Sequence, residues 1–381
     1  MGTPAAYGRL RGSDQAPRWP LGGARVGGTP SAAACTLARV PTVSARTFAK
    51  LSVASLVMVV LIVVTGAAVR LTGSGLGCPD WPSCYRTRLT AQLSFHPMVE
   101  FGNRMVTVVL TIVVAATVLA ALRRRPWRRD LVWLSFGLVG GVVGQAVLGG
   151  IVVYTKLNPY LVAIHFLLSM VLVVVGVLLV HRARRDYSPG SGRPLLDRTL
   201  RLLAWGIVGF LGVVLAAGSF TTGAGPHAGS SQGQLVAKRI PMSLRDMAEL
   251  HSSLALFLVG VTLSFVVALH ALDVPERVRR AGRILVATMV AQAAVGYTQY
   301  FTHLPAALVE VHVLGATVLV VGATQFVVAM VHHRPDPALA GAPSDTEAEA
   351  GLPLPSAVVT SGAAEEEPSV PRPSGSVTVP S

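Results

Sequence analysis

The stretch QAVLGGIVVYTKLNPYLVAIH, residues 145–165, recurs later in the chain as QAAVGYTQYFTHLPAALVEVH, residues 292–312. The two stretches align without gaps, and each residue of the second lies 147 positions (292 minus 145) after its counterpart. Leucine and valine identities carry little weight in apolar segments. The remaining shared pairs are Gln145 with Gln292, Gly149 with Gly296, Thr155 with Thr302, and His165 with His312. A repeat over this distance indicates two similar units, each built from several elements.

Long apolar runs surround both copies of the repeat. The chain of 381 residues is 52% hydrophobic and 13% charged, with a mean hydropathy of +0.58, which is far from the composition of soluble domains. A bilayer needs about 20 consecutive apolar residues per helix. Eight such runs are present: 51–69, 98–121, 131–154, 160–181, 200–219, 247–271, 283–301 and 307–331. A signal peptide is the alternative for the first run, but roughly fifty residues precede it and no clear cleavage site follows.

These runs predict an all-α integral membrane protein with eight transmembrane helices. Each half holds four runs, and RLTGSG (70–75) parallels FTTGAG (220–225) after an odd-numbered run. We therefore expect two parallel-repeat four-helix bundles, unlike the inverted repeats of many transporters. The predicted parts are a disordered basic cytoplasmic tail (1–48), an N-terminal bundle (49–181), a cytoplasmic linker (182–199), a C-terminal bundle (200–333) and a second disordered cytoplasmic tail (334–381).

Basic residues are distributed unevenly between the connections. The segment before the first run is rich in arginine, and the basic connections are RRRPWRRD (123–130), HRARRDYSPGSGRPLLDRTLR (181–201) and DVPERVRRAGR (273–283). The alternate connections hold few Lys or Arg residues, so both termini are predicted to be cytoplasmic in a multi-pass protein of the cell (plasma) membrane. The net charge of +14 is then an orientation signal beside membrane lipid, and we expect no nucleic-acid partner.

Cys78 and Cys84 lie in the first connection on the outer side of the membrane. They are six positions apart, whereas the third cysteine, Cys35, lies in the N-terminal tail. Disulfides persist on the oxidising side of a membrane, so we expect an intramolecular bridge between Cys78 and Cys84. The alternative is two unrelated thiols in one loop.

Three histidines share one depth in the predicted spans. His165, His251 and His312 each lie about five residues inside the outer end of an even-numbered run, which is about 7 Å deep in a helix. His251 and His312 belong to the same predicted bundle, and two facing imidazoles at one level are the usual axial ligands of a haem iron. The alternative for a single membrane histidine is a hydrogen-bonded packing residue.

The first half has the same frame with one substitution. His165 matches His312, but Asn103 occupies the position of His251 when one residue of slip is allowed, and asparagine is a poor haem ligand. His96 precedes Asn103 by two helical turns. It could supply a ligand, act through Glu100, or simply begin the helix at the interface.

Charged residues accompany this first site. Glu100 is placed for proton chemistry beside a haem with a weak or displaceable ligand. Arg104 and Arg70 suit haem propionates by bidentate pairing. The alternative is that Arg104 only reaches toward the interface and pairs with Glu100.

The residues around this site resemble a known family. GAAVRLTGSGLGCPDWPSC (66–84), followed by VEFGNR (99–104), is similar to the haem A synthase family, particularly its actinobacterial members. The resemblance covers roughly residues 48–333 and includes neither tail. It implies an oxidoreductase that converts a methyl substituent of haem O to the formyl group of haem A by successive hydroxylations.

The resemblance also implies roles for individual residues. A permanent haem b in the C-terminal bundle would use His251 and His312, and the substrate haem O in the N-terminal bundle would use His165. Glu100 corresponds to the glutamate of the family's Glu-x-x-His motif, but Asn103 replaces its histidine, which leaves His96 as our candidate for the second ligand. The family's paired loop cysteines correspond to Cys78 and Cys84, in a redox or a structural role.

The implied partners are the farnesyltransferase that produces haem O and the assembly of the terminal oxidase. A homo-oligomer is compatible with the sequence.

Two other functions fit parts of the pattern. A diheme b-type membrane cytochrome would transfer electrons without substrate chemistry, but a second pure electron carrier should keep both ligands and has no need of Glu100. A transporter or haem-trafficking channel would need a polar path across the bilayer. The polar groups instead cluster near the outer side, and Gly140 and Gly144 form a small-residue pair typical of close helix packing.

Overall fold

A computed structural model describes residues 42–87, 89–185, 187–230 and 237–335, with only the backbone described for 187–193 and 332–335. The predicted tails therefore lie largely outside the described residues, as does Cys35.

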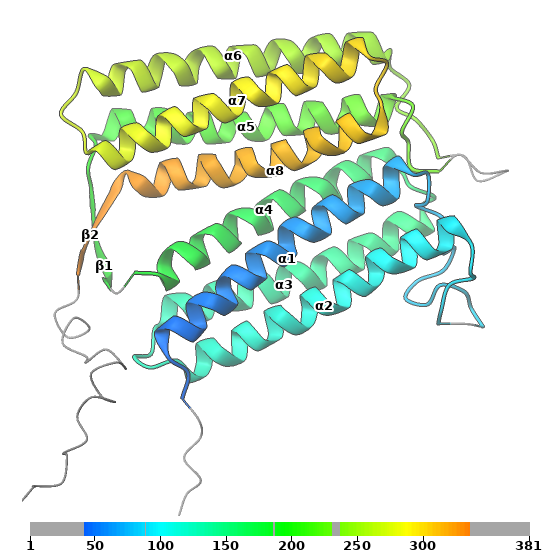
Figure 1. The fold of residues 1–381 in the computed structure, drawn as a ribbon, viewed down its shortest axis with the longest axis horizontal. Helices are drawn as coiled ribbons and strands as arrows, with labels where there is room; N and C mark the ends of the chain where they lie inside the picture. The colour runs from blue at the N-terminus through cyan, green and yellow to red at the C-terminus, as the bar shows by residue number, and fades with distance from the viewer. Residues whose placement is uncertain (1–41, 88, 186, 231–236, 336–381) are drawn as a thin grey trace, which may run out of the picture. The chain divides into compact units, whose positions relative to one another are not determined.

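The described chain forms eight long helices and one pair of short strands (Figure 1). The helices are α1 (Ala45–Leu71), α2 (Phe95–Arg123), α3 (Arg129–Tyr154), α4 (Pro159–Ala183), α5 (Arg198–Ala224), α6 (Leu244–His270), α7 (Glu276–Phe301) and α8 (Ala306–Ala329). Strand β1 (Tyr187–Pro194) pairs antiparallel with β2 (Val331–Pro335). Every predicted run thus lies on a helix, while β1 occupies part of the segment predicted as a linker.

Most helices extend beyond the apolar runs that predicted them, although α6 ends one residue and α8 two residues before the ends of their runs. α1 begins at Ala45, inside the stretch predicted to be a tail, because the Ser44 side chain caps it by accepting a hydrogen bond from the Thr47 N–H at 3.1 Å. α5 continues to Ala224 and so includes most of FTTGAG. Hydropathy marks only the apolar middle of a helix, whereas capping decides its ends.

Seven helices are long and apolar enough to cross a membrane. α7 is the exception among the described helices, because Glu276 and several arginines fill its first two turns and Gln292 and Gln299 lie further along. The helix predicted at 283–301 is present, and its crossing of the membrane stays a prediction. Large apolar side chains such as Ile112, Trp133 and Val267 are exposed on the outside of the helices, as expected of surfaces that face lipid.

Neighbouring helices form two groups, α1 to α4 and α5 to α8 (Figure 1). Within each group every helix packs on the next, and the last packs back on the first. The groups meet mainly through contacts of α8 with α1 and α4, and of α4 with α5. One cluster of buried apolar side chains, which draws residues from all eight helices, holds the two groups together.

The turns that join α3 to α4 and α7 to α8 have the same backbone conformation. Lys156 and Leu157 in the first turn have φ values of 54° and 59°, and His303 and Leu304 in the second have 64° and 60°. These residues are separated by the same 147 positions (303 minus 156) as the sequence repeat. The repeated hairpin is therefore alike in sequence and in backbone. A parallel repeat of complete bundles stays a prediction.

Candidate functional site

His251 on α6 and His312 on α8 face each other inside the second group of helices. Their ring centres are 6.3 Å apart, with an angle of 78° between the ring planes. An imidazole nitrogen lies roughly 2 Å from a bound metal ion and its ring centre ~1 Å further, so two axial imidazoles on one iron have centres about 6 Å apart. The separation of His251 and His312 therefore fits a haem iron between them.

The surroundings of these two rings also fit axial ligands. His251 Nδ1 is hydrogen-bonded to the carbonyl oxygen of Val214 at 3.1 Å, an arrangement that leaves Nε2 for a metal. The ring of His312 lies against Gly296 of α7, where an added Cβ would come within 3.1 Å of its Cε1. His312 Nδ1 is buried without a hydrogen-bond partner among the described residues.

His165 on α4 has the same setting as His312. Its Cε1 would lie 3.5 Å from a Cβ added at Gly149 of α3, and its Nδ1 is buried without a partner in the described part of the chain. The Gln145 side chain donates to the His165 carbonyl at 3.0 Å, as Gln292 does to the His312 carbonyl at 2.7 Å. The repeat thus preserves the surroundings of one histidine in each half.

The second helix of the first group holds Asn103 and His96 by side-chain hydrogen bonds. Asn103 Oδ1 accepts from the hydroxyl of Thr65 on α1 at 2.7 Å. His96 lies in the first turn of α2, and its Nδ1 is hydrogen-bonded to the Ser74 hydroxyl at 3.0 Å. No contact of His96 or Asn103 with the His165 ring is recorded in the described part, so the second ligand on this side stays a prediction.

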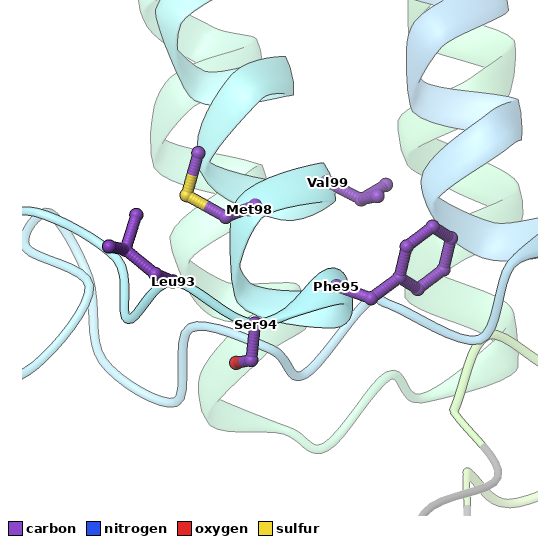
Figure 2. Close-up of a pocket in the computed structure, with 5 residues that line it drawn as sticks. All are labelled: Leu93, Ser94, Phe95, Met98 and Val99. Atoms are coloured by element: carbon purple, nitrogen blue, oxygen red, sulfur yellow. The ribbon is translucent and has the colours of Figure 1, made fainter.

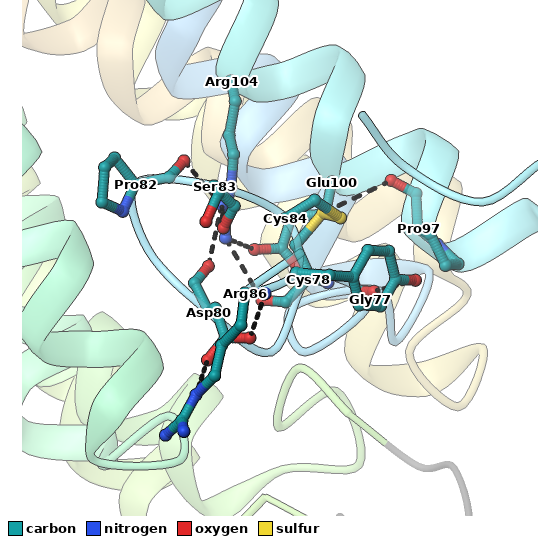
Figure 3. Close-up of a disulfide and its surroundings, with 11 residues drawn as sticks. Gly77, Cys78, Asp80, Pro82, Ser83, Cys84, Arg86, Pro97, Glu100 and Arg104 are labelled. Carbon is teal, nitrogen blue, oxygen red and sulfur yellow. Dashed lines mark hydrogen bonds and ion pairs between the residues drawn. A yellow bond between two sulfur atoms is a disulfide. The ribbon is translucent and has the colours of Figure 1, made fainter. Parts of the chain in front are cut away.

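Glu100 is a buried carboxylate that has a neutral donor at one oxygen and a charged donor at the other (Figure 3). Its Oε2 accepts from the backbone N–H of Cys78 at 2.8 Å, and its Oε1 pairs with Arg104 Nη2 at 2.6 Å. Cys78 forms a disulfide with Cys84, which confirms the predicted bridge in the structure. Part of the connection between α1 and α2, hereafter the disulfide loop (residues 77–86), therefore lies directly on the carboxylate of α2.

Arg70, at the end of α1, connects loops of the two groups of helices. Its Nε donates to the carbonyl oxygen of His227 at 2.9 Å, and the His227 ring is hydrogen-bonded to the Leu304 carbonyl at 2.9 Å. In the same region the Gly75 N–H donates to the Gly229 carbonyl at 2.9 Å. The terminal Nη groups of Arg70 make no hydrogen bond recorded among the described residues.

Sequence reasoning missed two buried polar residues on α7 and α8. Both carboxylate oxygens of Glu310, two positions before His312, are buried without a hydrogen-bond partner in the described residues. The side-chain oxygen of Gln299 on α7 is in the same state. An acidic residue in an apolar helix was the signal that could have identified Glu310.

An apolar hollow lies at the start of α2, beside the disulfide loop. Leu93, Ser94, Phe95, Met98 and Val99 line it (Figure 2). Leu93 and Phe95 are largely exposed. The lining contains no titratable group.

One protein-family model covers most of the described helices and both histidine sites. The family model COX15-CtaA, described as cytochrome oxidase assembly protein, matches residues 49–324. The chain belongs to this family of cytochrome oxidase assembly proteins. The matched range includes all the sequence-predicted site residues of both halves and excludes the two tails.

Three relatives of the chain share one name. A "Heme A synthase" of Geobacillus kaustophilus is 37% identical over 147 residues, covering 35% of this chain and 45% of the relative. The protein of the same name from Geobacillus thermodenitrificans is 39% identical, covering 36% of this chain and 44% of the relative. A third, from Staphylococcus carnosus, is 26% identical over 69% of this chain and 87% of the relative. The chain thus matches less than half the length of the two Geobacillus relatives.

Proposed function

We propose that this protein is a haem A synthase, an oxidoreductase of the membrane that converts a methyl substituent of haem O to the formyl group of haem A. The observation that carries the proposal is the setting of Glu100, a buried carboxylate held by Cys78 and Arg104 in the half that contains His165. The name shared by relatives in the same family supports it. The product would serve the assembly of the terminal oxidase.

The second group of helices would hold a resident haem b. His251 and His312 would hold it, because the separation of their ring centres suits two ligands of one iron. A glycine beside each ring, Gly218 for His251 and Gly296 for His312, leaves room for the imidazole. A haem with two protein ligands supplies electron transfer when bound. Glu310 would then be the nearest acidic residue along α8, two positions from a ligand.

The first group would bind the substrate, haem O. His165 would be one axial ligand, and the side opposite it would be formed by Asn103 and, from the start of α2, by His96. Among the described residues the Nη groups of Arg70 have no hydrogen-bond partner and could serve a propionate, whereas Arg104 is engaged by Glu100 and the disulfide loop. We therefore assign the propionate contact to Arg70 and keep Arg104 in the wall of the site.

Glu100 would be the catalytic group that moves protons. A methyl carbon hydroxylated twice becomes a formyl group by losing water, and this loss requires a proton acceptor and donor near the carbon. The Glu100 carboxylate is suited to this role because burial excludes bulk water and its donors fix both oxygens. The hydroxyl of Thr65 on α1 orients the side chain of Asn103, which lies on α2 as Glu100 does.

The rival function is a diheme b-type cytochrome without substrate chemistry. It would explain His251 and His312 equally well. It gives no reason for a buried Glu100 in the half where His165 lacks a matching histidine, and the family of the chain favours the synthase.

The protein would be a multi-pass protein of the plasma membrane with both termini in the cytoplasm, and α7 would be its eighth span. The disulfide loop would then lie on the outer, oxidising side. Its partners would be the farnesyltransferase that supplies haem O and the oxidase assembly that receives haem A, with a homo-oligomer left open.

The proposal is tested by Glu100→Gln in a bacterial host that lacks its own enzyme. The amide keeps an acceptor for Cys78 but cannot act as a base, so haem A formation should fall by about 100-fold. Haem O or a partly oxidised haem should accumulate while the b-type spectrum is retained. Chromatography of extracted haems measures both.

Glu249→Gln is the matched control, because Glu249 is an exposed carboxylate that also pairs with an arginine four residues away. It should leave haem A formation unchanged. Haem A at the wild-type level in Glu100→Gln would contradict the assignment of Glu100. A wild-type chain that yields haem b alone would favour the diheme cytochrome.

A further inference from the structure

The guanidinium of Arg104 is surrounded by acceptors from one loop. Nη1 donates to the carbonyl oxygens of Asp80 at 2.9 Å, Ser83 at 3.0 Å and Pro82 at 3.3 Å. Nη2 donates to the Cys78 carbonyl at 3.2 Å and to Glu100 Oε1 at 2.6 Å. Figure 3 shows the side chain reaching from α2 into the curve of the disulfide loop.

These contacts join three parts of the site through one side chain. Arg104 and Glu100 lie one turn apart on α2, and the four carbonyls belong to the loop that is closed by the Cys78–Cys84 bond. Only a planar, permanently charged fork with several donors can serve a carboxylate and several carbonyls together. The pairing with Glu100 alone would not need the loop.

The loop in turn reaches Glu100 by a second route. The Cys78 N–H donates to Oε2 of the same carboxylate whose Oε1 Arg104 contacts. The loop backbone also passes very close to the first turn of α2, since a Cβ added at Gly77 would lie within 2.5 Å of the His96 carbonyl oxygen. The position of the loop therefore decides whether Glu100 has its backbone donor.

We propose that Arg104 is a positioning residue that clamps the disulfide loop onto α2, so that the Cys78 N–H holds Glu100 in place for proton transfer. The inference rests on the proposed function for the role of Glu100. It assigns to Arg104 a structural partner, the loop carbonyls, in place of a haem propionate.

The clamp makes the disulfide part of the same unit. Cys78 and Cys84 are 0% and 1% exposed, so a reductant reaches the bond only when the loop opens locally. Reduction removes the covalent closure of the loop, and an open loop withdraws both the Cys78 N–H and the carbonyls from α2. Glu100 is then held only when the two cysteines are oxidised.

The first test measures loop opening directly. In full-length protein with Cys35→Ser, the only remaining cysteines are Cys78 and Cys84, and their reduction by dithiothreitol can be followed by maleimide labelling. Arg104→Gln should accelerate reduction roughly tenfold, because loop opening no longer breaks the guanidinium contacts. Arg104→Lys should be intermediate, since it keeps the charge but loses the fork.

Arg86→Gln is the matched control for this test. Arg86 is an arginine of the same loop whose side chain is 92% exposed and lies 3.9 Å from Asp80. It should leave the reduction rate unchanged. A wild-type reduction rate in Arg104→Gln would overturn the clamp, whatever the protein catalyses.

The second test separates positioning from general damage. Arg104→Gln and the pair Cys78→Ser with Cys84→Ser should each lower haem A formation roughly tenfold, with the haem b absorbance retained, and their combination should lower it no further. Independent structural damage would instead multiply the losses and overturn the shared route through Glu100. If the wild-type chain makes no haem A, the proposed function fails, and the reduction rates still decide the clamp.

Discussion

Each proposed histidine ligand lies beside a glycine on the preceding helix. The His251 ring lies over Gly218 of α5, the His312 ring over Gly296 of α7, and the His165 ring near Gly149 of α3. A methyl group at Gly218 would come within 2.9 Å of the His251 Cε1 atom, which is shorter than a normal contact between carbon atoms. A glycine inside a helix costs about 1 kcal/mol relative to alanine. The space for the imidazole explains why this cost is retained.

Gly218→Ala should displace the His251 ring and so weaken its hydrogen bond to Val214 and its match to His312. We expect the low-spin haem b signal to fall by roughly twofold or more, although alanine itself favours the helix. Gly212→Ala, on the same helix, places its methyl in open space and should leave the spectrum unchanged. Optical spectra of the two purified variants measure the difference, and equal spectra would show that the glycine is not needed for the ligand.

At the scale of elements, helical hairpins set the depth of the histidines. In both α3–α4 and α7–α8, two consecutive residues in the left-handed conformation form the turn. In each hairpin a glutamine on the first helix donates to the backbone carbonyl of the histidine on the second. A fixed turn and a fixed cross-helix hydrogen bond place His165 and His312 at equal distances from the outer end. The second half also has His251 on α6, and among the described residues only this half brings two imidazoles together.

His251→Ala or His312→Ala should abolish the low-spin haem b spectrum, because each removes one of two axial ligands supplied by different helices. His270→Ala, at the last residue of α6, is the control, since His270 is exposed and bonds only within its own helix end and to Arg283. Reduced-minus-oxidised spectra of membranes are sufficient. A normal spectrum in either ligand variant would mean that the haem b ligands lie elsewhere.

At the scale of the whole molecule, the two groups of helices are joined in their apolar core and again by loops at one end of the helices. The loop contacts are the Gly75–Gly229 hydrogen bond and the chain from Arg70 through His227 to Leu304. The second half cannot form a disulfide of this kind, because the chain's remaining cysteine, Cys35, precedes α1. The proposed substrate site thus differs from the proposed haem b site both in its ligands and in its cover.

Membrane orientation gives a prediction at this scale. If α7 crosses the membrane, Asp273 lies on the cytoplasmic side and Thr302 on the outer side, and both residues are exposed. In the Cys35→Ser background, Thr302→Cys should react with a membrane-impermeant maleimide in intact cells, whereas Asp273→Cys should react only after permeabilisation. Labelling of both from the same side would show that α7 does not span.

The sequence by itself predicted all eight helices, and for the seven that are long and apolar enough to cross a membrane the reason is that such runs have no other stable state in a bilayer. It also determined the matching depth of His165 and His312, since a gapless repeat preserves helical positions. It could not place Arg70 against His227, which is 157 positions away, or direct Arg104 into the disulfide loop. Such contacts depend on the packing of helices and on loop paths, for which hydropathy and spacing carry no information. The tertiary structure therefore decided the surroundings of Glu100, which the sequence predicted for proton chemistry but could not connect to the Cys78 N–H or to the carbonyls of the disulfide loop.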